Sequence, residues 1–250
     1  MNEHHPPLPN LPPGKSIQSR INFIVRISFD LMIMSVLPKL KLWLSTLNGE
    51  ILEVGCGLQP YRYLVPNTCI YQGLDWEKSN EAFDYMTPDT IYYNGITFPF
   101  RNDKFLFLFH TEVIEHIFDT NSFLHECHRV LKPNGTLFFT VPFQARYHYI
   151  PNDYWRFTPA SLKKILQANG FKNIIITNRG TDITVAQYKN ISVIYRWLRG
   201  PLYKKLVGII FIPVAIFSLI VGHCTLYWNI GSSDDCLGYC VTAEKEVNIF

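Results

Sequence analysis

Two groups of residues have types and spacings that could do chemistry. The first is the stretch ILEVGCGLQPY, in which an apolar run ends at Glu53 and is followed by Gly55 and Gly57. Glycines at this place allow a tight backbone turn that a ligand can approach closely. A pyrophosphate has no use for a carboxylate beside it, whereas a ligand with a cationic end does. The stretch therefore predicts a binding turn for a nucleotide-like ligand that carries a positive charge.

The second group could take up a proton. His116 follows a strand-like run in FHTEVIEH, and a histidine at the end of a strand suits general-base chemistry near neutral pH. His148 and Asp153, in the stretch YHYIPNDYWRF, are alternative catalytic residues. The structural alternative is that Glu115 and His116 only cap the segment that follows them. The sequence leaves these alternatives open.

The stretch YHYIPNDYWRF also carries side chains that suit a polyhydroxyl acceptor. Flat aromatic rings stack on sugar faces, and arginine and aspartate form hydrogen bonds with hydroxyls. The predicted substrate residues are therefore Tyr154, Trp155 and Arg156. The alternative is a rigid loop that closes over a cofactor without touching the acceptor.

These residues need a scaffold that brings them to one edge. Strand-like runs alternate with helical segments, which predicts a mostly parallel α/β sheet. The pair Thr158-Pro159 predicts a helix start and Gly170 its end. An apolar helical segment at 20–47 is expected to break near Pro38. The predicted strands are 50–54, 70–74, 90–94, 105–110, 136–141, 172–177 and 238–243, and the other predicted helices are 119–131 and 159–168.

In a parallel sheet, ligands bind beyond the carboxyl ends of the strands, so the glycine turn is a candidate nucleotide site. A dinucleotide site needs a third small residue in the pattern Gly-x-Gly-x-x-Gly. Here the turn reads Gly55-x-Gly57-x-x-Pro60, and the third position does not fit. A nicotinamide-dependent oxidoreductase is therefore the less favoured alternative.

The sequence resembles the class I S-adenosylmethionine-dependent methyltransferases over about residues 47–180 and the last strand. That family's first motif is an acidic residue followed by Gly-x-Gly at the end of strand one, which Glu53, Gly55 and Gly57 match. Its second motif is an acid that closes strand two, which is Asp75 in YQGLDW. The resemblance implies a Rossmann-like, seven-stranded, mostly parallel sheet with helices on both faces. Apolar helices are added near the N-terminus and before the last strand.

The resemblance also implies contacts to the cofactor S-adenosyl-L-methionine. Asp75 would hold the ribose hydroxyls, and Trp76 would lie beside the adenine. Asn94 would read the adenine amino group, and Glu53 would bind the methionine ammonium directly or through water. The other implied cofactor-binding residues are Gly55, Cys56, Gly57, His110 and Thr111.

The most specific part of the resemblance is the stretch 109–143. The residues that stand where the family pattern expects them are Glu115, His116, Arg129, Leu131, Pro133 and Gly135. The chain departs from the pattern at Leu106, where the family usually has an aspartate, and at Gln59, where it frequently has a glycine. These departures keep open the alternative of a protein that binds S-adenosylmethionine without turnover.

Composition narrows the class of protein. A net charge of +3 over 250 residues gives no basic field for nucleic acid. The six cysteines include no C-x-x-C pair, and the polar, proline-rich start is not a secretory signal, so we expect a cytoplasmic protein with reduced thiols. The stretch HECH at 125–128 lacks a second cluster of ligands, so no metal site is expected.

We expect a disordered tail at 1–17 and one methyltransferase domain at 18–250, with 190–230 as an apolar helical insertion. The segment 206–222 carries no charge over 17 residues and follows four cations. A single crossing of a bilayer would separate the last strand from its sheet, so we expect a helix at the membrane interface. A buried core or dimer contact, or a true span, are the alternatives.

Together these features predict a methyltransferase that acts on an oxygen of a small-molecule acceptor. The acceptor would be a sugar, a lipid-linked sugar or another membrane-proximal metabolite, and no nucleic acid partner is expected. The protein would lie in the cytoplasm, peripherally on the inner face of the membrane.

Overall fold

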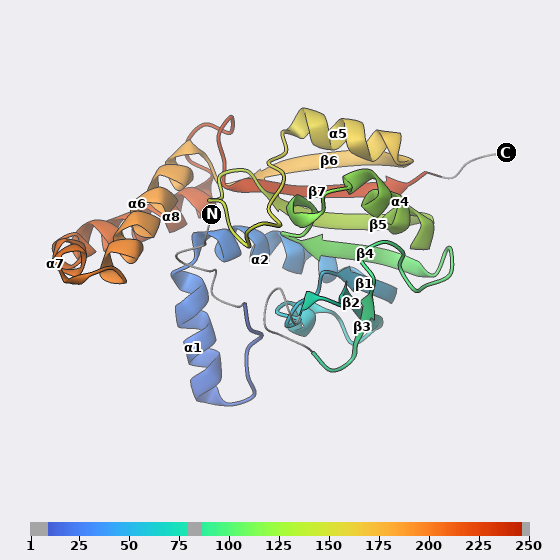
Figure 1. Cartoon of the computed structure of the whole chain (residues 1–250), viewed down its shortest axis with the longest axis horizontal. Helices are drawn as coiled ribbons and strands as arrows, with labels where there is room; N and C mark the ends of the chain where they lie inside the picture. Colours follow the sequence, from blue (N-terminus) through green and yellow to red (C-terminus); the bar gives the residue numbers. More distant parts are fainter. Residues whose placement is uncertain (1–9, 80–86, 247–250) are drawn as a thin grey trace.

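The computed structural model describes residues 10–79 and 87–246, and its centre is a seven-stranded sheet (Figure 1). The strands are β1 (Gly49–Val54), β2 (Cys69–Trp76), β3 (Thr90–Tyr93), β4 (Phe105–Thr111), β5 (Leu131–Pro142), β6 (Phe171–Arg179) and β7 (Gly238–Lys245). Their order is β3-β2-β1-β4-β5-β7-β6, with β7 antiparallel to β5 and β6 and the other pairs parallel. All seven predicted strands and the mostly parallel α/β class are confirmed.

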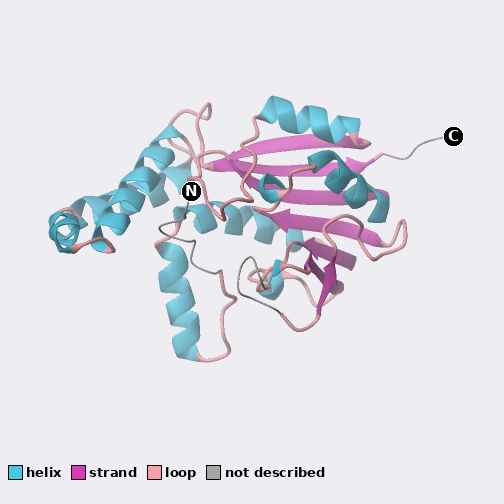
Figure 2. Cartoon of the chain, viewed as in Figure 1, coloured by secondary structure: helices cyan, strands magenta, loops and turns pink. Residues whose placement is uncertain are grey.

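Helices cover both faces of the sheet (Figure 2). The described helices are α1 (Ile17–Ser28), α2 (Leu31–Leu44), α4 (Thr120–Val130), α5 (Pro159–Ala168), α6 (Asp182–Leu198), α7 (Leu202–Ile210) and α8 (Ile212–Trp228), with the 3₁₀ turns η1 (Arg62–Leu64) and η2 (Ile114–His116). α2 packs on one face, in a cluster with Ile51 and Phe138. α4 and α5 pack on the other, with Leu52 and Phe139. Adjacent strand residues thus point to opposite faces, and both faces are buried.

The helix predicted to start at Thr158 and end before Gly170 is confirmed as α5, but the predicted break near Pro38 is wrong. Pro38 lies inside α2, and the chain breaks instead at Asp30, whose carboxylate caps α2. Because Pro38 is exposed, water can bond the carbonyl of Met34, which loses its helical donor. Of the predicted tail, residues 1–9 lie outside the described residues.

The connection between β1 and β2 is short and contains no α-helix. Residues 55–68 contain only the single 3₁₀ turn η1. Pro60 and Pro66 bracket that turn, and each proline lacks an N–H and restricts the residue before it. A longer helix does not fit between them, so the glycine turn is followed by a short, closed loop.

A helical arm follows β6 and projects beyond the end of the sheet (Figure 1); it consists of α6, α7 and α8, residues 182–228. Its outgoing and returning helices are joined by a 2.8 Å hydrogen bond between the hydroxyls of Thr184 and Thr225. The chain then enters β7, where Gly238 pairs with Arg179 at the end of β6. The arm therefore leaves and rejoins the sheet at the same edge, as the topological argument predicted.

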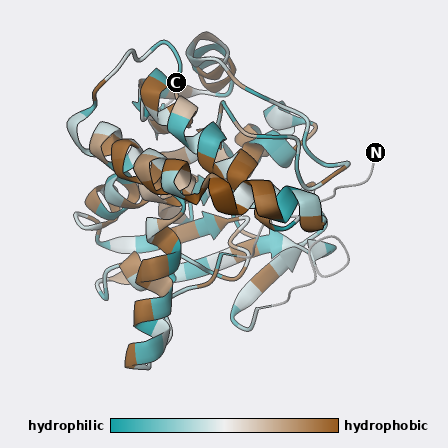
Figure 3. Ribbon diagram, turned by 90° about the vertical axis from the view of Figure 1, so that its left-hand side faces the viewer, coloured by the Kyte–Doolittle hydropathy of each residue, from teal (hydrophilic) through white to brown (hydrophobic). Residues whose placement is uncertain are grey.

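Apolar side chains are exposed on the helical arm and on α1. Figure 3 shows the apolar residues along the helices on this side of the molecule. They include Leu202, Leu206, Ile209, Ile210, Phe217 and Ile220 on the arm and Ile17, Ile21, Ile24 and Val25 on α1. No single described helix is both long and apolar enough to cross a bilayer. Two bent pairs reach that length and composition together, α1 with α2 at 109° and α7 with α8 at 56°.

Candidate active site

The glycine turn lies where the strand order reverses. β1 pairs with β2 on one side and with β4 on the other, and ligands of such sheets bind at this point. Gly55 and Gly57 have φ angles of +65° and +51°, which glycine adopts without steric cost. A Cβ on Gly55 would lie 2.6 Å from a methyl group of Val113. The turn therefore needs glycine at this position for space as well as for conformation.

Asp75 at the end of β2 closes the turn. Its Oδ2 accepts a hydrogen bond from the backbone N–H of Gly57 at 2.9 Å. Its Oδ1 accepts from the N–H of Trp76 at 2.7 Å and from the hydroxyl of Ser79 at 3.0 Å. The indole of Trp76 packs against Gly95, where a Cβ would lie 3.0 Å from the ring nitrogen. Two predicted cofactor residues thus lie directly against the glycine turn and the loop after β3.

Glu53 is buried beneath the same turn. Its Oε2 accepts a 2.5 Å hydrogen bond from the hydroxyl of Tyr71. Burial raises the pKa of the Glu53 carboxyl to about 8, although the hydrogen bond from Tyr71 opposes that shift. A cationic ligand group beside this carboxyl would favour its ionised form.

Gln59 explains how the turn does without the family's frequent third glycine. Its φ is +53°, which costs a residue with a side chain about 1–2 kcal/mol. The buried side chain offsets this cost, because its Nε2 donates to Thr90 at 2.9 Å and its Oε1 accepts from Arg62 at 2.8 Å. Gln59 therefore fastens the turn to β3 and to η1.

Three other positions that were singled out from the sequence have structural roles in the surroundings described next. Cys56 is buried, and burial raises the pKa of its thiol, so it is not poised as a nucleophile. The Oδ1 of Asn94 accepts from the N–H groups of Ile96 and Thr97 at 2.9 and 3.1 Å, so this oxygen caps a turn. Leu106 lies where the pairing of β4 with β5 shifts register, which makes its departure from the family pattern a matter of strand packing.

His110 and Thr111 end β4. His110 is fully buried, with its ring stacked on Phe139 at 4.7 Å between centroids and edge-on to Phe123 at 5.3 Å. Neither ring nitrogen has a hydrogen-bond partner, and burial lowers the pKa of His110 to about 3, so the ring is neutral. A buried polar group without a partner is costly, and at this strand end a bound ligand could relieve that cost.

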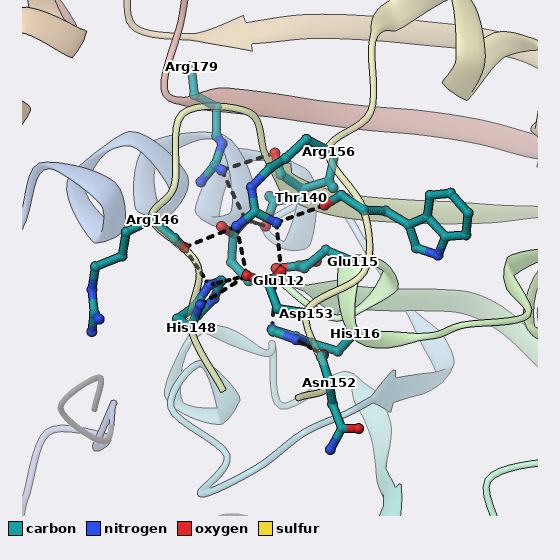
Figure 4. A network of polar contacts seen from close by, with 12 residues as sticks. Glu112, Glu115, His116, Thr140, Arg146, His148, Asn152, Asp153, Arg156 and Arg179 are labelled. Atoms are coloured by element: carbon teal, nitrogen blue, oxygen red, sulfur yellow. Dashed lines mark hydrogen bonds and ion pairs between the residues drawn. The ribbon is translucent and has the colours of Figure 1, made fainter. Parts of the chain in front are cut away.

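Residues that follow β4 and β5 meet in one polar cluster (Figure 4). We call it the Glu-His cluster; it consists of Glu112, Glu115, His116, His148 and Asp153. The first three follow β4 and the last two lie in the loop after β5. The residue between Glu112 and η2 is Val113, whose side chain packs against Gly55, so the cluster adjoins the glycine turn. The structure thus brings all three predicted catalytic residues together.

Both histidines of the cluster are held through Nδ1. His116 Nδ1 lies 2.6 Å from the carbonyl oxygen of Asn152. His148 Nδ1 lies 2.9 Å from the carbonyl oxygen of Arg146 and 3.0 Å from a carboxylate oxygen of Asp153. Since these partners only accept, Nδ1 carries a hydrogen in both rings, and Nε2 has a lone pair whenever the ring is neutral. Burial lowers the pKa of His116 to about 4, so its ring is neutral at physiological pH.

The loop after β5 is fixed to the cluster by its own side chains. Asp153 pairs with the guanidinium of Arg156 at 2.6 and 2.8 Å. Burial alone raises the pKa of Asp153, but the bonds from Arg156 and from the N–H of His148 hold it below its ordinary value. The backbone N–H groups of Tyr154 and Trp155 both donate to the backbone carbonyl oxygen of Glu115 in η2, at 2.9 and 3.2 Å. Of the predicted substrate residues, Arg156 thus serves this ion pair, whereas the two aromatic rings stay exposed.

Sequence reasoning did not single out two members of this region, Glu112 and Arg179. Arg179 is fully buried at the end of β6, and its Nη2 lies 2.9 Å from Glu112 Oε1. The same oxygen accepts from the hydroxyl of Thr140 at 2.8 Å. The one signal in the sequence is a charged residue that ends an apolar strand, as at Glu53 and Asp75.

Glu115 has the least usual surroundings of the cluster. It is fully buried, and neither of its carboxylate oxygens has a hydrogen-bond partner within residues 10–79 and 87–246. The Nε2 of His116 lies 3.7 Å from its Oε1. Burial raises the pKa of Glu115 well above its ordinary value.

Comparison with known proteins decides the family. Residues 52–139, which run from β1 through β5, match the family model described as a methyltransferase domain. This part of the chain is therefore a methyltransferase domain, in agreement with the resemblance to the class I enzymes, whose cofactor is S-adenosylmethionine. No curated protein sequence matches the chain.

Solved structures share the fold of this methyltransferase. The [4+2]-cyclase SpnF has a TM-score of 0.55 and 18% identity, with 87% of this chain and 83% of that chain covered. A putative sarcosine dimethylglycine methyltransferase from Galdieria sulphuraria has a TM-score of 0.54 and 16% identity, with 86% and 88% covered. The CurJ carbon methyltransferase has a TM-score of 0.50 and 13% identity, with 88% and 59% covered.

The glycine turn of the methyltransferase fits S-adenosylmethionine. Gly55 leaves no room for a Cβ, and the buried carboxyls of Glu53 and Asp75 lie at the ends of neighbouring strands. Two acids suit a ligand with hydroxyls and a cationic amine and do not suit a phosphate. We propose that Glu53, Gly55, Gly57, Asp75 and Trp76 hold the cofactor. Since SpnF, which shares the fold, is a [4+2]-cyclase, the fold does not identify the reaction or the acceptor.

Proposed function

We propose that this methyltransferase methylates a hydroxyl oxygen of a small, membrane-proximal acceptor, such as a sugar or a lipid-linked sugar. The observation that carries the proposal is the pair of imidazoles, His116 and His148, beside the glycine turn. Their rings lie 4.9 Å apart between centroids, and each is held through Nδ1 so that Nε2 keeps its lone pair. A hydroxyl must lose its proton to become a good nucleophile, and such nitrogens serve that need.

S-adenosylmethionine supplies a methyl group that its sulfonium already activates, so the protein has mainly to prepare the acceptor. The chain's own residues must orient the hydroxyl, remove its proton and keep water away. Asp153 orients His148, and the loop after β5 is fastened to η2 by two backbone hydrogen bonds. This rigid support holds the imidazoles in place without a need for reorganisation when the acceptor binds.

A sugar is the acceptor class that the surrounding side chains support. Tyr154 and Trp155 are 42% and 40% exposed, and they flank the cluster from the loop after β5. The indole N–H of Trp155 donates to the carbonyl of Ile117 at 3.0 Å, which fixes the ring. Exposed, fixed aromatic rings suit stacking on the apolar face of a sugar.

The helical arm supports an acceptor that comes from a lipid surface. The arm follows β6, whose end at Arg179 contacts Glu112 of the cluster, so the arm and the cluster share one end of the sheet (Figure 1). Ile210 and Phe217 of the arm are 74% and 64% exposed. We propose that the arm and α1 lie in the membrane interface and that the protein is peripheral on the cytoplasmic face.

The test of the proposed function is release of S-adenosylhomocysteine by the purified full chain with fractionated acceptor pools. We expect release with a lipid or glycolipid extract and a product that mass spectrometry identifies as a methyl ether. Methylation only of amines or of carbon, or release only with soluble, apolar acceptors, would refute it.

The membrane contact has a separate test. Ile210→Ser, Phe211→Ser and Phe217→Ser in one variant should release the protein from anionic vesicles. Each large apolar side chain that is buried contributes about 1.5–3 kcal/mol, so the triple change should abolish co-sedimentation. The matched control replaces Ile70, Ile96 and Ile175, which are 71%, 70% and 60% exposed on strands and loops of the sheet domain. If the wild type stays in the supernatant, the exposed apolar face contacts a protein rather than lipid.

A further inference from the structure

Three residues of the Glu-His cluster have ligand atoms that converge on one point. Glu115 and His116 lie in η2, and His148 lies in the loop after β5. One ligand atom of each lies within 4.8 Å of the others. Atoms that bind one ion at about 2.0–2.2 Å lie roughly 3–4 Å apart, so a small closure brings the three atoms into coordination distance.

Both histidines are prepared as ligands. A metal binds the nitrogen that keeps its lone pair, and a hydrogen bond from the other nitrogen fixes the ring. His116 donates from Nδ1 to the carbonyl of Asn152, and His148 donates from Nδ1 toward Asp153 and the carbonyl of Arg146. A carbonyl and a carboxylate are the usual supports behind metal-bound histidines. Each ring therefore presents Nε2 as the available ligand.

Glu115 gives an independent indication of a missing cation. Its carboxylate is fully buried, and neither oxygen has a hydrogen-bond partner among the residues that the structure describes. Burying a carboxylate without a partner is expensive, and a coordinated ion is one of the few arrangements that offset this cost. The Nε2 of His116 lies 3.7 Å from the carboxylate, and it is a second prospective ligand and not a donor.

The neighbouring cations are already compensated by other acids. Arg179 pairs with Glu112 at 2.9 Å, and Arg156 pairs with Asp153 at 2.6 Å. Each guanidinium therefore has its own carboxylate next to the cluster. Glu115 is the carboxylate of the cluster that remains available to bind a metal cation.

We propose that Glu115, His116 and His148 bind one divalent cation of the first transition row. Two imidazoles and one carboxylate suit Mn²⁺, Co²⁺ or Zn²⁺ better than an all-oxygen cation such as Ca²⁺. From the sequence, HECH was the one stretch considered for a metal, and no metal was expected there. In the structure, Cys127 of that stretch lies on α4 with its side chain buried in the core, so the proposed site lies elsewhere.

Three protein ligands leave coordination positions open for water or an acceptor hydroxyl. A hydroxyl held there would have a lowered pKa and would release its proton to solvent at neutral pH. This role rests on the proposed function, since it needs an oxygen acceptor. It also assigns His116 and His148 the role of ligands that position the acceptor, instead of the role of bases.

The binding itself can be measured without cofactor or acceptor. Chelator-treated, full-length protein is titrated with CoCl₂, and the visible absorption of the bound ion reports imidazole and carboxylate coordination. We expect saturation at one equivalent. Glu115→Gln and His148→Ala should each weaken binding by about 100-fold or more, since outer-shell changes alone cost about 10–100-fold.

The matched control is His125→Ala, because His125 is exposed on α4 away from the cluster. It should bind Co²⁺ like the wild type. Circular dichroism shows whether each variant is folded, and if Glu115→Gln is not, His148→Ala in the more exposed loop decides. Absence of binding by the wild type, or equal binding by His148→Ala and the control, overturns the proposal.

The same preparations separate this inference from the proposed function. Binding of Co²⁺ without methylation of any hydroxyl acceptor, with or without the ion, leaves the site intact and refutes the proposed function. Hydroxyl methylation at an unchanged rate in chelator refutes the role of the ion. Methylation that falls with chelator and returns with Mn²⁺ or Co²⁺ supports both.

Discussion

The two loop systems at the carboxyl edge of the sheet treat their buried acids differently. After β1 and β2, Glu53 accepts a bond from Tyr71, and Asp75 accepts bonds from the turn and from Ser79. After β4 and β5, Glu115 is equally buried, and its carboxylate has no hydrogen-bond partner in the described part of the chain. The acids of the cofactor side, after β1 and β2, are therefore hydrogen-bonded within the protein, whereas the acceptor side, after β4 and β5, contains a buried acid that a bound ligand could pair with.

This difference indicates which side needs a ligand for its own stability. Buried polar groups without partners are rare in proteins, and each calls for an explanation. On the cofactor side the turn can exist before S-adenosylmethionine binds, because its acids stabilise its own backbone. On the acceptor side the proposed cation would complete the hydrogen-bonding and charge balance. Substitutions at four positions test the comparison, from the largest expected effect to the smallest.

His116→Ala should reduce turnover by roughly 10²–10⁴ with nearly unchanged affinity for S-adenosylmethionine. The reason is that His116 belongs to the acceptor side, whether it acts as ligand or as base. Release of S-adenosylhomocysteine gives the turnover, and calorimetry gives the affinity. His125→Ala is the matched control. Unchanged turnover would move the role to His148 or Asp153, or mean that neither a base nor a ligand is needed at this position.

Asp75→Ala should weaken S-adenosylmethionine binding by about 1–3 kcal/mol, the cost of leaving ribose hydroxyls without a charged acceptor. Turnover at saturating cofactor should change much less than in His116→Ala. The control is Asp103→Ala, whose carboxylate pairs with Lys245 at the opposite edge of the sheet. Calorimetric titration decides, and tight NADH binding by the wild type would contradict the assignment of the turn.

Glu53→Gln should change how stability depends on pH. The pKa of Glu53 is about 8 in the folded protein, against an ordinary value of 4.5. Because the folded state holds this proton more tightly, the contribution of Glu53 is fully present below about pH 4.5 and is lost as pH rises toward 8. Within this window the free energy of unfolding of the wild type should fall by about 1.4 kcal/mol per pH unit relative to the variant.

Urea unfolding of both proteins at several pH values measures this slope for Glu53. The glutamine keeps an oxygen that can accept the bond from Tyr71, so the variant differs mainly in its inability to ionise. If the free energies of unfolding of the two proteins change in parallel with pH, Glu53 is charged throughout this pH window. The cofactor side would then contain a buried, ionised acid.

Gln59→Ala and Gln59→Gly should separate the two roles of this residue. Both variants lose the bonds to Thr90 and Arg62, each worth about 1 kcal/mol. Only glycine also relieves the φ of +53°, so Gln59→Gly should be about 1 kcal/mol more stable than Gln59→Ala. Chemical denaturation measures the difference. If the two variants are equally stable, the turn relaxes at residue 59 and does not impose the positive φ angle.

Much of the cofactor side could be predicted from the sequence, because its parts are close together along the chain. Glu53, Gly55 and Gly57 are adjacent in one motif, and Asp75 ends the next strand. The alternation of strands and helices then suffices to bring them to one edge. Between β1 and β2, the prolines at 60 and 66 leave room only for a 3₁₀ turn.

The acceptor side could be predicted only as separate candidates. His116 and His148 were each singled out as a base, but their distance apart depends on how the loop after β5 folds onto η2. Arg156 pairs with Asp153, and Arg179 pairs with Glu112. The spacing of these residues in the sequence does not predict either pair. Nothing in the sequence indicates that Glu115 would be buried without a partner.

The sequence by itself determined the strands, the mostly parallel class of the sheet and the glycine turn, because periodicity and short motifs encode local conformation and burial. Tertiary structure alone decided which side chains share the Glu-His cluster. It also decided which acids receive hydrogen bonds and that the helical arm projects from the end of the sheet that carries the cluster. The physical reason is that hydrogen bonds, ion pairs and metal coordination depend on distances of a few ångströms between atoms far apart in the chain. Those distances exist only once the strands, loops and arm have packed.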